Sequence, residues 1–541
     1  MGVRALARGA AAALLVLAVE RAAHAQDTRH AYTIPHVLRY ATAEDIVGLN
    51  AHLNQQSTLA YMSSLTMAWL VRFDHDNKPV PELATAVPTR ANGGISADGK
   101  TITYRLRTGV KWSDGADFTS ADVKFSADVV LDPDNNEGTH VGFDKLTAVH
   151  TPDPSTIVFR LREPHAQYAA NFFGSAGGNP CILPKHKFTS TKINTAPYND
   201  LPVGIGPFKY ASWKRGDSVE MVPDPLYFRG RPKLERVVFK LIPDRNTVLT
   251  QLTTHELDMW LPVPPAFADR VHGLGGIDVV QQPSYLYDHI DLNQQHGPLD
   301  DLAVRRALRY AIDRRAILAK VRHGAGVLQE SPMPPTHPLF APSIPRIPFD
   351  LAAANAMLER AGWRRGSDGI RAKNGKRLEF VYASSAGVPD TDQQIELIRT
   401  WWRQIGADFT VRRYLSSLLF APYGGGGILY GGKYDVTNFA WTQNPLGDMT
   451  NIYACDRVPP KGQNVGRYCN PMVDRAMRRL STTYDPAEQR AASRYIQEQM
   501  VRDVATIVLE IRKDTFAYNS DLHGFRPNQV TPFDDFMNVD I

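Results

Sequence analysis

The sequence pattern changes along the chain from one typical of strands to one in which helices alternate with strands. In the first half, Ile102, Tyr104 and Leu106 alternate with polar residues after the Asp98-Gly99 turn, which predicts a half-buried strand. Further strands are predicted at 156–161, within 203–241 and at 285–292. Beyond residue 297, helix patterns alternate with strands for about 200 residues. We therefore expect a strand-rich half followed by an α/β unit.

Local signals place several helices. A capping box of Thr119 and Asp122 begins one helix, Asp350 and Gly362 bound another, and Asp485-Pro486 begins a third. A further helix precedes a strand at 408–414; its predicted apolar face carries Ile395, Ile398, Trp402 and Ile405. The helix near residue 304 has an apolar face and a flank that we expect to be solvated; the face consists of Val304, Ala307, Leu308, Ala311 and Ile312, and the flank of Arg305, Arg306, Arg309 and Arg314.

The N-terminus has the pattern of a cleavable secretory signal. Arg4 and Arg8 precede an apolar run at 10–19, and Ala23-His24-Ala25 is an A-x-A cleavage site. A membrane anchor is the alternative, but the apolar run is short and is interrupted by Glu20-Arg21. The earliest cysteine is Cys181, so no lipid attachment is expected at the cleavage point. We predict a periplasmic protein of a Gram-negative cell.

Composition and cysteine usage agree with an exported globular protein. The 541 residues are 43% hydrophobic and 22% charged, with a net charge of +5, which excludes a disordered chain or a multi-span membrane protein. Basic residues form no long run, so no nucleic-acid partner is expected. Cys455 and Cys469 close a short loop and predict a disulfide, while Cys181 is expected to be a small buried hydrophobe.

Motifs of catalysis and of metal binding are missing from the sequence. It contains no G-x-S-x-G, S-x-x-K, H-E-x-x-H or P-loop motif, and its histidines lack ligand spacing. The glycine run 424–427 is predicted to be a surface loop rather than a phosphate site. We expect no cofactor, no metal and no catalysis. An exported hydrolase stays open as an alternative, because catalytic residues can assemble from distant positions.

Several co-linear motifs span nearly the whole mature chain, and they are 81–84, 98–107, 109–115, 118–123, 202–208, 304–314, 359–362 and 433–435. Together they resemble the bacterial extracellular solute-binding proteins of family 5, the periplasmic peptide- or nickel-binding receptors of ABC importers. The resemblance implies a two-lobed α/β periplasmic binding protein (type II, with the three-domain architecture of family 5) with its ligand cleft between the lobes. It also implies a monomer that captures a small solute by lobe closure and delivers it to the transmembrane subunits of a permease.

The resemblance further implies a domain division. After the signal peptide (1–25), the first lobe comprises 26–75, 205–292 and 509–541, with a strand-rich insertion at 76–204. The second lobe is the α/β region 293–508, and the hinge strands are expected near 292–293 and 507–510.

The implied ligand site centres on the segment from Trp441 to Asp448. In peptide-binding relatives an aspartate after a tryptophan anchors the ligand ammonium, and Asn444 stands at the matching position here. Asp448 is therefore either the replacement anchor, or a solvated loop carboxylate or helix cap, and Trp441 is either a cleft wall or a core residue. Further candidates are Tyr285, Tyr287, Gln56 and Ser57.

The ligand predicted from this resemblance is a peptide or a peptide-like solute. The alternatives are a nickel chelate, an oligosaccharide or an opine-like molecule. The sequence also leaves open whether a chemosensory partner is used in addition to a permease.

Overall fold

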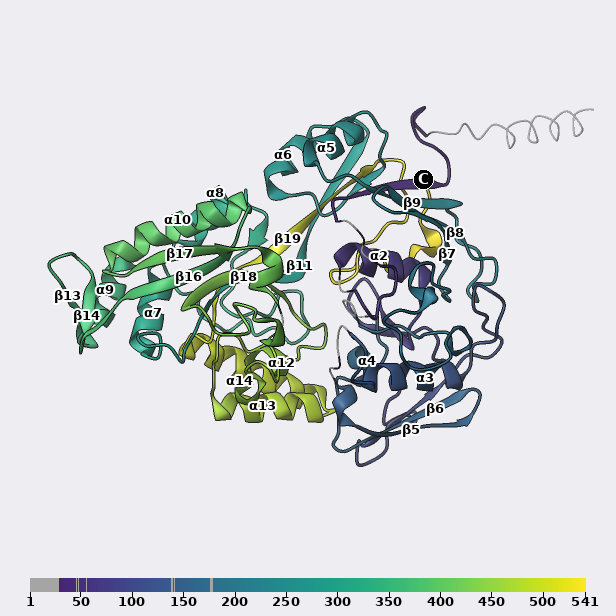
Figure 1. Ribbon diagram of the computed structural model, residues 1–541, viewed down its shortest axis with the longest axis horizontal. Coiled ribbons are helices and arrows are strands. Elements are labelled where there is room, and N and C mark those ends of the chain that lie inside the picture. Colours follow the sequence, from purple (N-terminus) through teal and green to yellow (C-terminus); the bar gives the residue numbers. More distant parts are fainter. Residues whose placement is uncertain are drawn as a thin grey trace, which may run out of the picture.

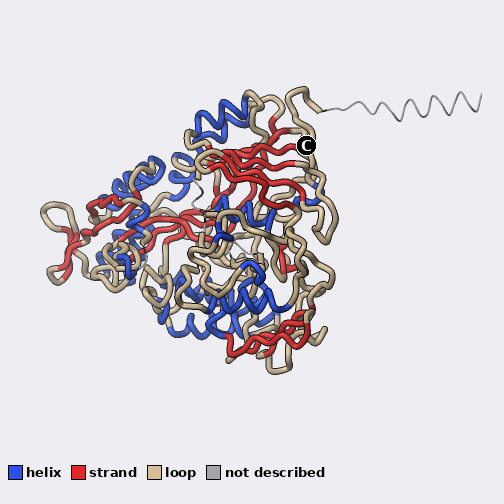
Figure 2. The backbone as a smooth tube through the Cα atoms, turned by 45° about the vertical axis from the view of Figure 1, so that its right-hand side comes forward, coloured by secondary structure: helices blue, strands red, loops and turns tan. Residues whose placement is uncertain are grey.

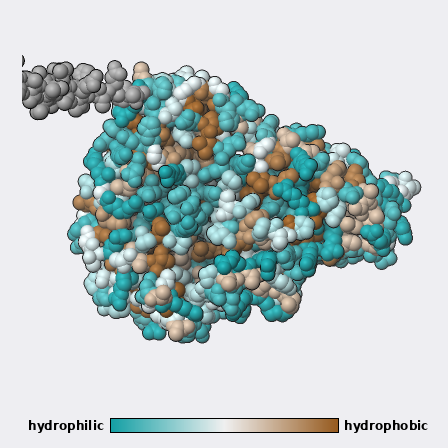
Figure 3. Space-filling model, turned by 180° about the vertical axis from the view of Figure 1, so that it is seen from behind, coloured by the Kyte–Doolittle hydropathy of each residue, from teal (hydrophilic) through white to brown (hydrophobic). Residues whose placement is uncertain are grey.

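The structure, a computed structural model, describes residues 29–541 apart from 45, 47, 55, 138, 139, 141, 176–178 and 422. The predicted signal peptide lies outside the described residues. Within these ranges, every helix is too short or too polar to span a membrane. The rear face is largely hydrophilic, with hydrophobic patches among hydrophilic residues (Figure 3).

A single mixed sheet of eleven strands runs through both halves of the molecule, in the order β17-β16-β18-β11-β19-β10-β1-β9-β8-β7, with β12 paired to β19. We call the part around β1 the first lobe and the part around β16–β18 the second lobe (Figure 1). The first-lobe strands are β1 (Val37–Thr42), β7 (Phe208–Lys214), β8 (Ser218–Pro223), β9 (Arg236–Leu241) and β10 (Met259–Trp260). Those of the second lobe are β12 (Gly326–Val327), β16 (Glu379–Ser385), β17 (Asp408–Tyr414) and β18 (Val436–Thr442).

Two long antiparallel strands, β11 (Ile277–Leu292) and β19 (Ile507–Asn519), join the lobes (Figure 1). The first part of β11 pairs with the end of β19, beside β10, and its last residues pair with β18. The ladder between β11 and β19 shifts register between Pro283 and Tyr287. Such an irregularity weakens the ladder locally, so the lobes are connected where the sheet can bend.

The second lobe has an α/β core, as the helix–strand alternation predicts. Its helices are α7 (Leu302–Tyr310), α8 (Arg314–Lys320), α9 (Leu351–Arg360), α10 (Pro389–Gln404), α11 (Ser416–Leu419), α12 (Thr450–Tyr453), α13 (Pro471–Thr482) and α14 (Pro486–Asp503). The predicted apolar residues of α7 and α10 are buried in one cluster with Phe380, Tyr382 and Phe409 of the sheet. Asp350 and Asp485 cap α9 and α14 as expected.

The predicted solvated flank is wrong for Arg305, Arg309 and Arg314, whereas Arg306 is half-buried. Arg305 and Arg309 are only 7% and 8% exposed, and Arg314 is 9% exposed. Arg305 donates to the carbonyl of Asp503 at 3.0 Å and Arg309 to that of Val501 at 2.5 Å. These carbonyls end α14 and have no partners within that helix, so cationic side chains complete their hydrogen bonds and complement the helix dipole.

A separate three-stranded sheet, β4 (Thr101–Arg105), β6 (Thr156–Leu161) and β5 (Leu146–Asp153), follows the first-lobe helix α2 (Ser57–Thr66). The short β2 (Val71–Phe73) and β3 (Pro79–Pro81) pair nearby in the chain. Figure 2 shows helices and loops between the three-stranded sheet and the large sheet. Thr119 and Asp122 make the predicted capping box of α3 (Ser120–Leu131). This part has its own core, which includes Ile102, Tyr104 and Trp112.

Three further α-helices belong to the described part of the chain. They are α4 (Tyr168–Asn171), after β6, and α5 (Arg245–Thr253) and α6 (Ala268–His272), on either side of β10.

Candidate ligand-binding site

A tight turn follows β18 and places the predicted anchor segment. The sequence Asn444-Pro445-Leu446-Gly447 has favoured turn residues at its first, second and fourth positions, and Gly447 N donates to Asn444 O at 2.9 Å. Asn444 Oδ1 also accepts a hydrogen bond from Leu446 N at 2.8 Å. Gly447 has a φ of +80°, and a Cβ there would lie 2.8 Å from Leu339 Cδ1. Asn444 therefore uses its acceptor oxygen to shape the turn.

A neutral histidine holds this turn against β11. His337 Nε2 donates to Asn444 O at 3.2 Å, and its Nδ1 accepts from Leu339 N at 3.0 Å. Burial lowers the pKa of His337 to about 4, so the ring is uncharged at neutral pH. The ring packs against Tyr285, with centroids 5.4 Å apart, and Tyr285 O accepts from Gln443 N at 2.8 Å.

Behind the turn lies a cavity of about 170 Å³, here called the inner cavity. Its walls come from both sides of the molecule, since Asn179 and Val530 face the segment that follows β18. Asp448 is its one charged lining residue in the described part of the chain; the other polar ones are Asn179, Thr442, Gln443, Asn444, Asn451 and Gln463. Gln443 is only 2% exposed, and its Nε2 has no hydrogen-bond partner among the described residues.

A second cavity of about 240 Å³, here called the outer cavity, also contacts Asp448 and Asn451. One wall runs from Gly142 to His165 and the other from Asp448 to Ser481. Its lining is strongly charged, with five carboxylates and three lysines or arginines: Asp144, Glu163, Asp448, Asp456 and Asp474 against Lys145, Arg457 and Arg478. This cavity is suited to charged groups, unlike the inner cavity.

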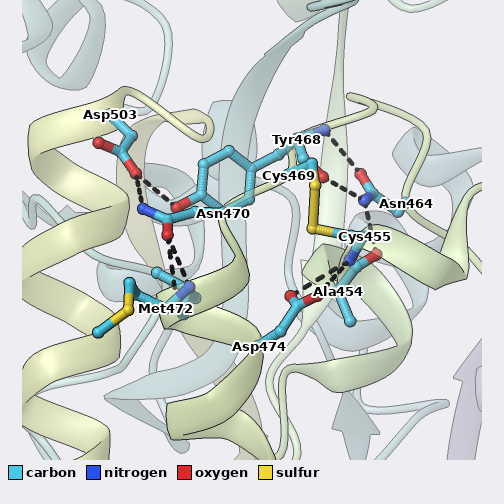
Figure 4. The surroundings of a disulfide bond; sticks show 10 residues. Ala454, Cys455, Asn464, Tyr468, Cys469, Asn470, Met472, Asp474 and Asp503 are labelled. Carbon is cyan, nitrogen blue, oxygen red and sulfur yellow. Dashed lines mark hydrogen bonds between the residues drawn. A yellow bond between two sulfur atoms is a disulfide. The ribbon is translucent and has the colours of Figure 1, made fainter.

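The disulfide between Cys455 and Cys469 braces the second-lobe wall of the outer cavity (Figure 4). This is the pair predicted from the sequence. Cys455 N donates to both carboxylate oxygens of Asp474, at 3.2 and 3.3 Å. Asn464 Nδ2 binds the carbonyls of Ala454 and Tyr468, at 2.9 and 2.7 Å. The crosslink and these bonds hold the segment from Ala454 to Asp474 in place. Cys181 is free and buried, in the first-lobe core.

Beyond the outer cavity, the second lobe contacts the part of the chain around the three-stranded sheet, so the two sides of the cleft touch in this structure. Tyr484, between α13 and α14, donates to Gly99 O at 3.1 Å and accepts from His165 N at 3.3 Å. The guanidinium carbon of Arg90 lies 5.1 Å from the centre of the Tyr484 ring. Beside it, Ala166 N donates to Ser481 O at 2.7 Å. In Figure 1 these helices accordingly lie next to α4.

The structure brings only some of the predicted site residues together. Asn444 and Asp448 line the inner cavity, and Trp441 lies shortly before them on β18, 5.1 Å from the ring of Phe439. Tyr285 is buried behind the turn, and burial raises its pKa to about 12. Tyr287 is fully buried, and its hydroxyl bonds that of Tyr453 at 3.0 Å, which places it in the core.

Gln56 and Ser57 lie at the start of α2 in the first lobe, where Gln56 Oε1 accepts from Asn54. Sequence reasoning missed Gln443, Asn179 and the acidic wall around Asp474. Gln443 adjoins the predicted anchor and could have been included. Asn179 and Val530 carry no local signal, because they reach the cavity only through the fold.

Comparison with known proteins identifies related sequences over most of the chain. The model of the family described as "Bacterial extracellular solute-binding proteins, family 5 Middle" matches residues 78–462. Protein XP55 of Streptomyces lividans is 30% identical over 452 residues, covering 80% of this chain and 76% of the relative. The glutathione-binding protein GsiB of Salmonella typhimurium is 28% identical, covering 82% of this chain and 84% of its own.

Solved structures share the fold. The oligopeptide-binding protein AppA from Bacillus subtilis, in complex with a nonapeptide, matches with a TM-score of 0.79 at 22% identity, covering 93% of this chain and 98% of that chain. NikZ from Campylobacter jejuni, in complex with Ni(L-His), matches with a TM-score of 0.78 at 23% identity over 93% and 98% of the two chains. These likenesses confirm the predicted α/β binding-protein fold.

Proposed function

The chain belongs to the bacterial extracellular solute-binding proteins of family 5, and we propose that it is the periplasmic substrate-binding component of an ABC importer for peptides or peptide-like solutes. Members of this family bind substrates rather than transform them. The observation that carries the proposal is the inner cavity, whose walls come from segments as distant as Asn179, Asn444 and Val530. A ligand held there contacts both sides of the cleft only when it is closed, so binding shifts the protein towards the closed state.

The domain division expected from the sequence is part of this proposal. In it, the first lobe is built from 26–75, 205–292 and 509–541, with 76–204 inserted, and the second lobe is 293–508. The lobes rotate about β11 and β19, and the closed form presents one surface to the permease. The protein acts as a monomer, without metal or catalysis, after removal of residues 1–25.

Peptides are the preferred solute class because two relatives bind such ligands. AppA of Bacillus subtilis is an oligopeptide-binding protein, and GsiB is a glutathione-binding protein. A second candidate is an uncharged polar solute such as an oligosaccharide. It is favoured by the side-chain amides of the inner cavity, which hydrogen-bond hydroxyl groups without needing a charge.

A thermal-shift screen tests the proposal. Residues 26–541 are purified through unfolding, which removes carried-over ligand, and mixed with di- to pentapeptides, oligosaccharides or nickel chelates. A ligand at a hundred times its dissociation constant stabilises the folded protein by about 2.7 kcal/mol. A rise in melting temperature with peptides supports the proposal. A rise only with a saccharide or a chelate assigns the protein to another solute, and turnover of any added compound contradicts a purely binding role.

A further inference from the structure

We propose that the second lobe carries a further binding site, outside the cleft, for an amphipathic anion of single charge, such as a carboxylate with an apolar chain. The site is a cavity of about 430 Å³, here called the α8 cavity, which is formed by the start of α8, by Leu328 and by the segment 346–349. It shares no lining residue with the inner or the outer cavity. The inference goes beyond the proposed function and does not depend on it.

One part of the α8 cavity is apolar. Leu328 and Ile347 are half-buried in its lining, and Phe349 is 41% exposed. The ring of Phe349 packs against Trp401 of α10, with centroids 5.8 Å apart, which holds it in place while it remains accessible. An apolar ligand chain that covered these side chains would remove them from water, which favours binding.

A buried arginine stabilises the wall of this cavity. Arg314 is 9% exposed, forms an ion pair with Glu330 and donates to Val508 O of β19 at 3.1 Å. It also donates to Ile347 O at 3.3 Å, and Glu330 Oε1 accepts from Ile347 N at 3.0 Å. Ile347 is therefore held through both of its backbone groups. A wall that is built before the ligand arrives lowers the cost of binding.

The charge that remains for a ligand is positive. Arg315 and Arg346 are exposed lining residues, and their side chains make no hydrogen bond or ion pair within the described part of the chain. Asp313 is the one carboxylate of the described lining, and its Oδ1 caps α8 by accepting from Ala316 N at 3.0 Å. Two unpaired guanidinium groups against one carboxylate leave one positive charge unbalanced. The cavity therefore favours an anion of single charge over a cation.

A buried neighbour of Arg314 indicates the same excess of positive charge. Burial, opposed by Glu330 and reinforced by Arg314, lowers the pKa of Arg309 to about 10. The Nε of Arg309 is buried and has no hydrogen-bond partner among the described residues. Glu330 thus does not fully balance the arginines around α7 and α8, and an anion in the cavity would offset the remainder.

The segment that carries Arg346 is stiff. Pro345 and Pro348 lie on either side of Arg346 and Ile347, and residues 344–350 form no helix or strand. Each proline fixes its own φ and restricts the backbone of the residue before it. Arg346 is therefore presented in few backbone conformations, and Arg315 is held by α8, so both cations are placed in advance.

Titration calorimetry tests the site with octanoate and three comparison compounds. Octan-1-ol has the chain without the charge, hexanoate has a shorter chain, and inorganic phosphate has charge without a chain. Arg315→Gln and Arg346→Gln each remove one of the unpaired charges. Arg412→Gln on β17 is the matched control, because Arg412 is likewise exposed and without a side-chain partner in the described chain. It lines neither this cavity nor the inner or outer cavity.

We expect octanoate to bind one-to-one, and hexanoate to bind up to about 15-fold more weakly, since each buried methylene contributes about 4-fold in affinity. Octan-1-ol and phosphate should each bind at least about 10-fold more weakly than octanoate. Arg315→Gln and Arg346→Gln should each weaken octanoate by about 3- to 10-fold, and Arg412→Gln should not. Absence of octanoate binding, or equal binding of octanoate and octan-1-ol, overturns the inference and leaves the proposed function untouched.

Gln443→Glu, in the inner cavity, shows where the probe binds. Unchanged octanoate binding in this variant, with weaker binding in Arg346→Gln, supports the α8 cavity. Weaker binding in Gln443→Glu, with both arginine variants unchanged, places octanoate in the cleft and overturns the inference.

Cosedimentation with phosphatidylglycerol vesicles distinguishes the two sources of such an anion. Octanoate binding together with vesicle binding that is lost in Arg315→Gln and Arg346→Gln assigns the site to a membrane lipid. Octanoate binding without vesicle binding assigns it to a free amphipathic acid.

Discussion

Removing the ring of Tyr484 should open the cleft in the absence of ligand. This side chain belongs to the second lobe, yet its partners Gly99, His165 and Arg90 come from the other side of the cleft. These contacts exist only when the lobes meet, and none of them involves the inner cavity. Tyr484→Ala should therefore change the balance of open and closed states without altering the ligand contacts.

The magnitude follows from the contacts that are lost. Each hydrogen bond of the hydroxyl contributes about 0.5–1.5 kcal/mol, and the contact with Arg90 about 0.5–1 kcal/mol. Because the ring is only partly buried, we take the lower part of these ranges, a total of about 2 kcal/mol. The closed state would then lose about 30-fold in population relative to the open state. Ligand affinity should fall by at most the same factor, and by less the more of the wild-type protein is already closed before binding.

Small-angle X-ray scattering of the ligand-free protein measures the effect directly. Tyr484→Ala should have a larger radius of gyration than the wild type, and Tyr484→Phe, which keeps the ring, should lie between them. Tyr423→Ala is the control, since Tyr423 is 51% exposed and lies outside the contact. The reasoning is refuted if Tyr484→Ala and the wild type scatter identically both with and without ligand.

Further predictions concern β19, the disulfide and the turn. Burial, and then the carboxylate of Asp288, raise the pKa of Glu510 to about 7 from an ordinary 4.5, so the wild type should lose stability as the pH rises through this interval. Glu510→Gln should flatten this loss in urea unfolding followed from pH 4 to pH 8, and an unchanged slope would contradict the assignment. Replacing Cys455 and Cys469 by serine should lower the free energy of unfolding by about 3 kcal/mol, and the difference from the wild type should vanish under reducing conditions. Gly447→Ala should destabilise the turn by roughly 1–3 kcal/mol and weaken ligand binding, whereas the same change at the exposed Gly424, where a Cβ meets open space, should do neither.

The elements that the sequence predicts well are those determined by short-range interactions. The capping box of Thr119 and the N-cap of Asp350 act within one helical turn, and both form as expected. The flank of α7 was mispredicted because its environment is set from far along the chain. Arg305 looks like a surface residue until the end of α14 brings unpaired carbonyls beside it.

The cavities follow the same division between local and distant interactions. Asp448 and Asn444 could be proposed from one segment, but the facing residues Asn179 and Val530 are placed by tertiary structure alone. No sequence pattern predicts the contact of Tyr484 with Gly99 either. A tyrosine after a helix is common, and the partners of this one come from a distant part of the chain.

The turn at Asn444 shows how a local signal can decide a functional question. The sequence Asn-Pro-Leu-Gly is a turn motif, and in the structure the acceptor of Asn444 serves that turn. An oxygen used in this way is a poor partner for an ammonium group, which would also find no charge there to balance its own. Asp448 retains an unengaged oxygen and borders a space rich in carboxylates. If the ligand carries an ammonium group, the position that resembles the anchor of peptide-binding relatives is therefore the less favourable place for it, and the carboxylate of Asp448 is better suited.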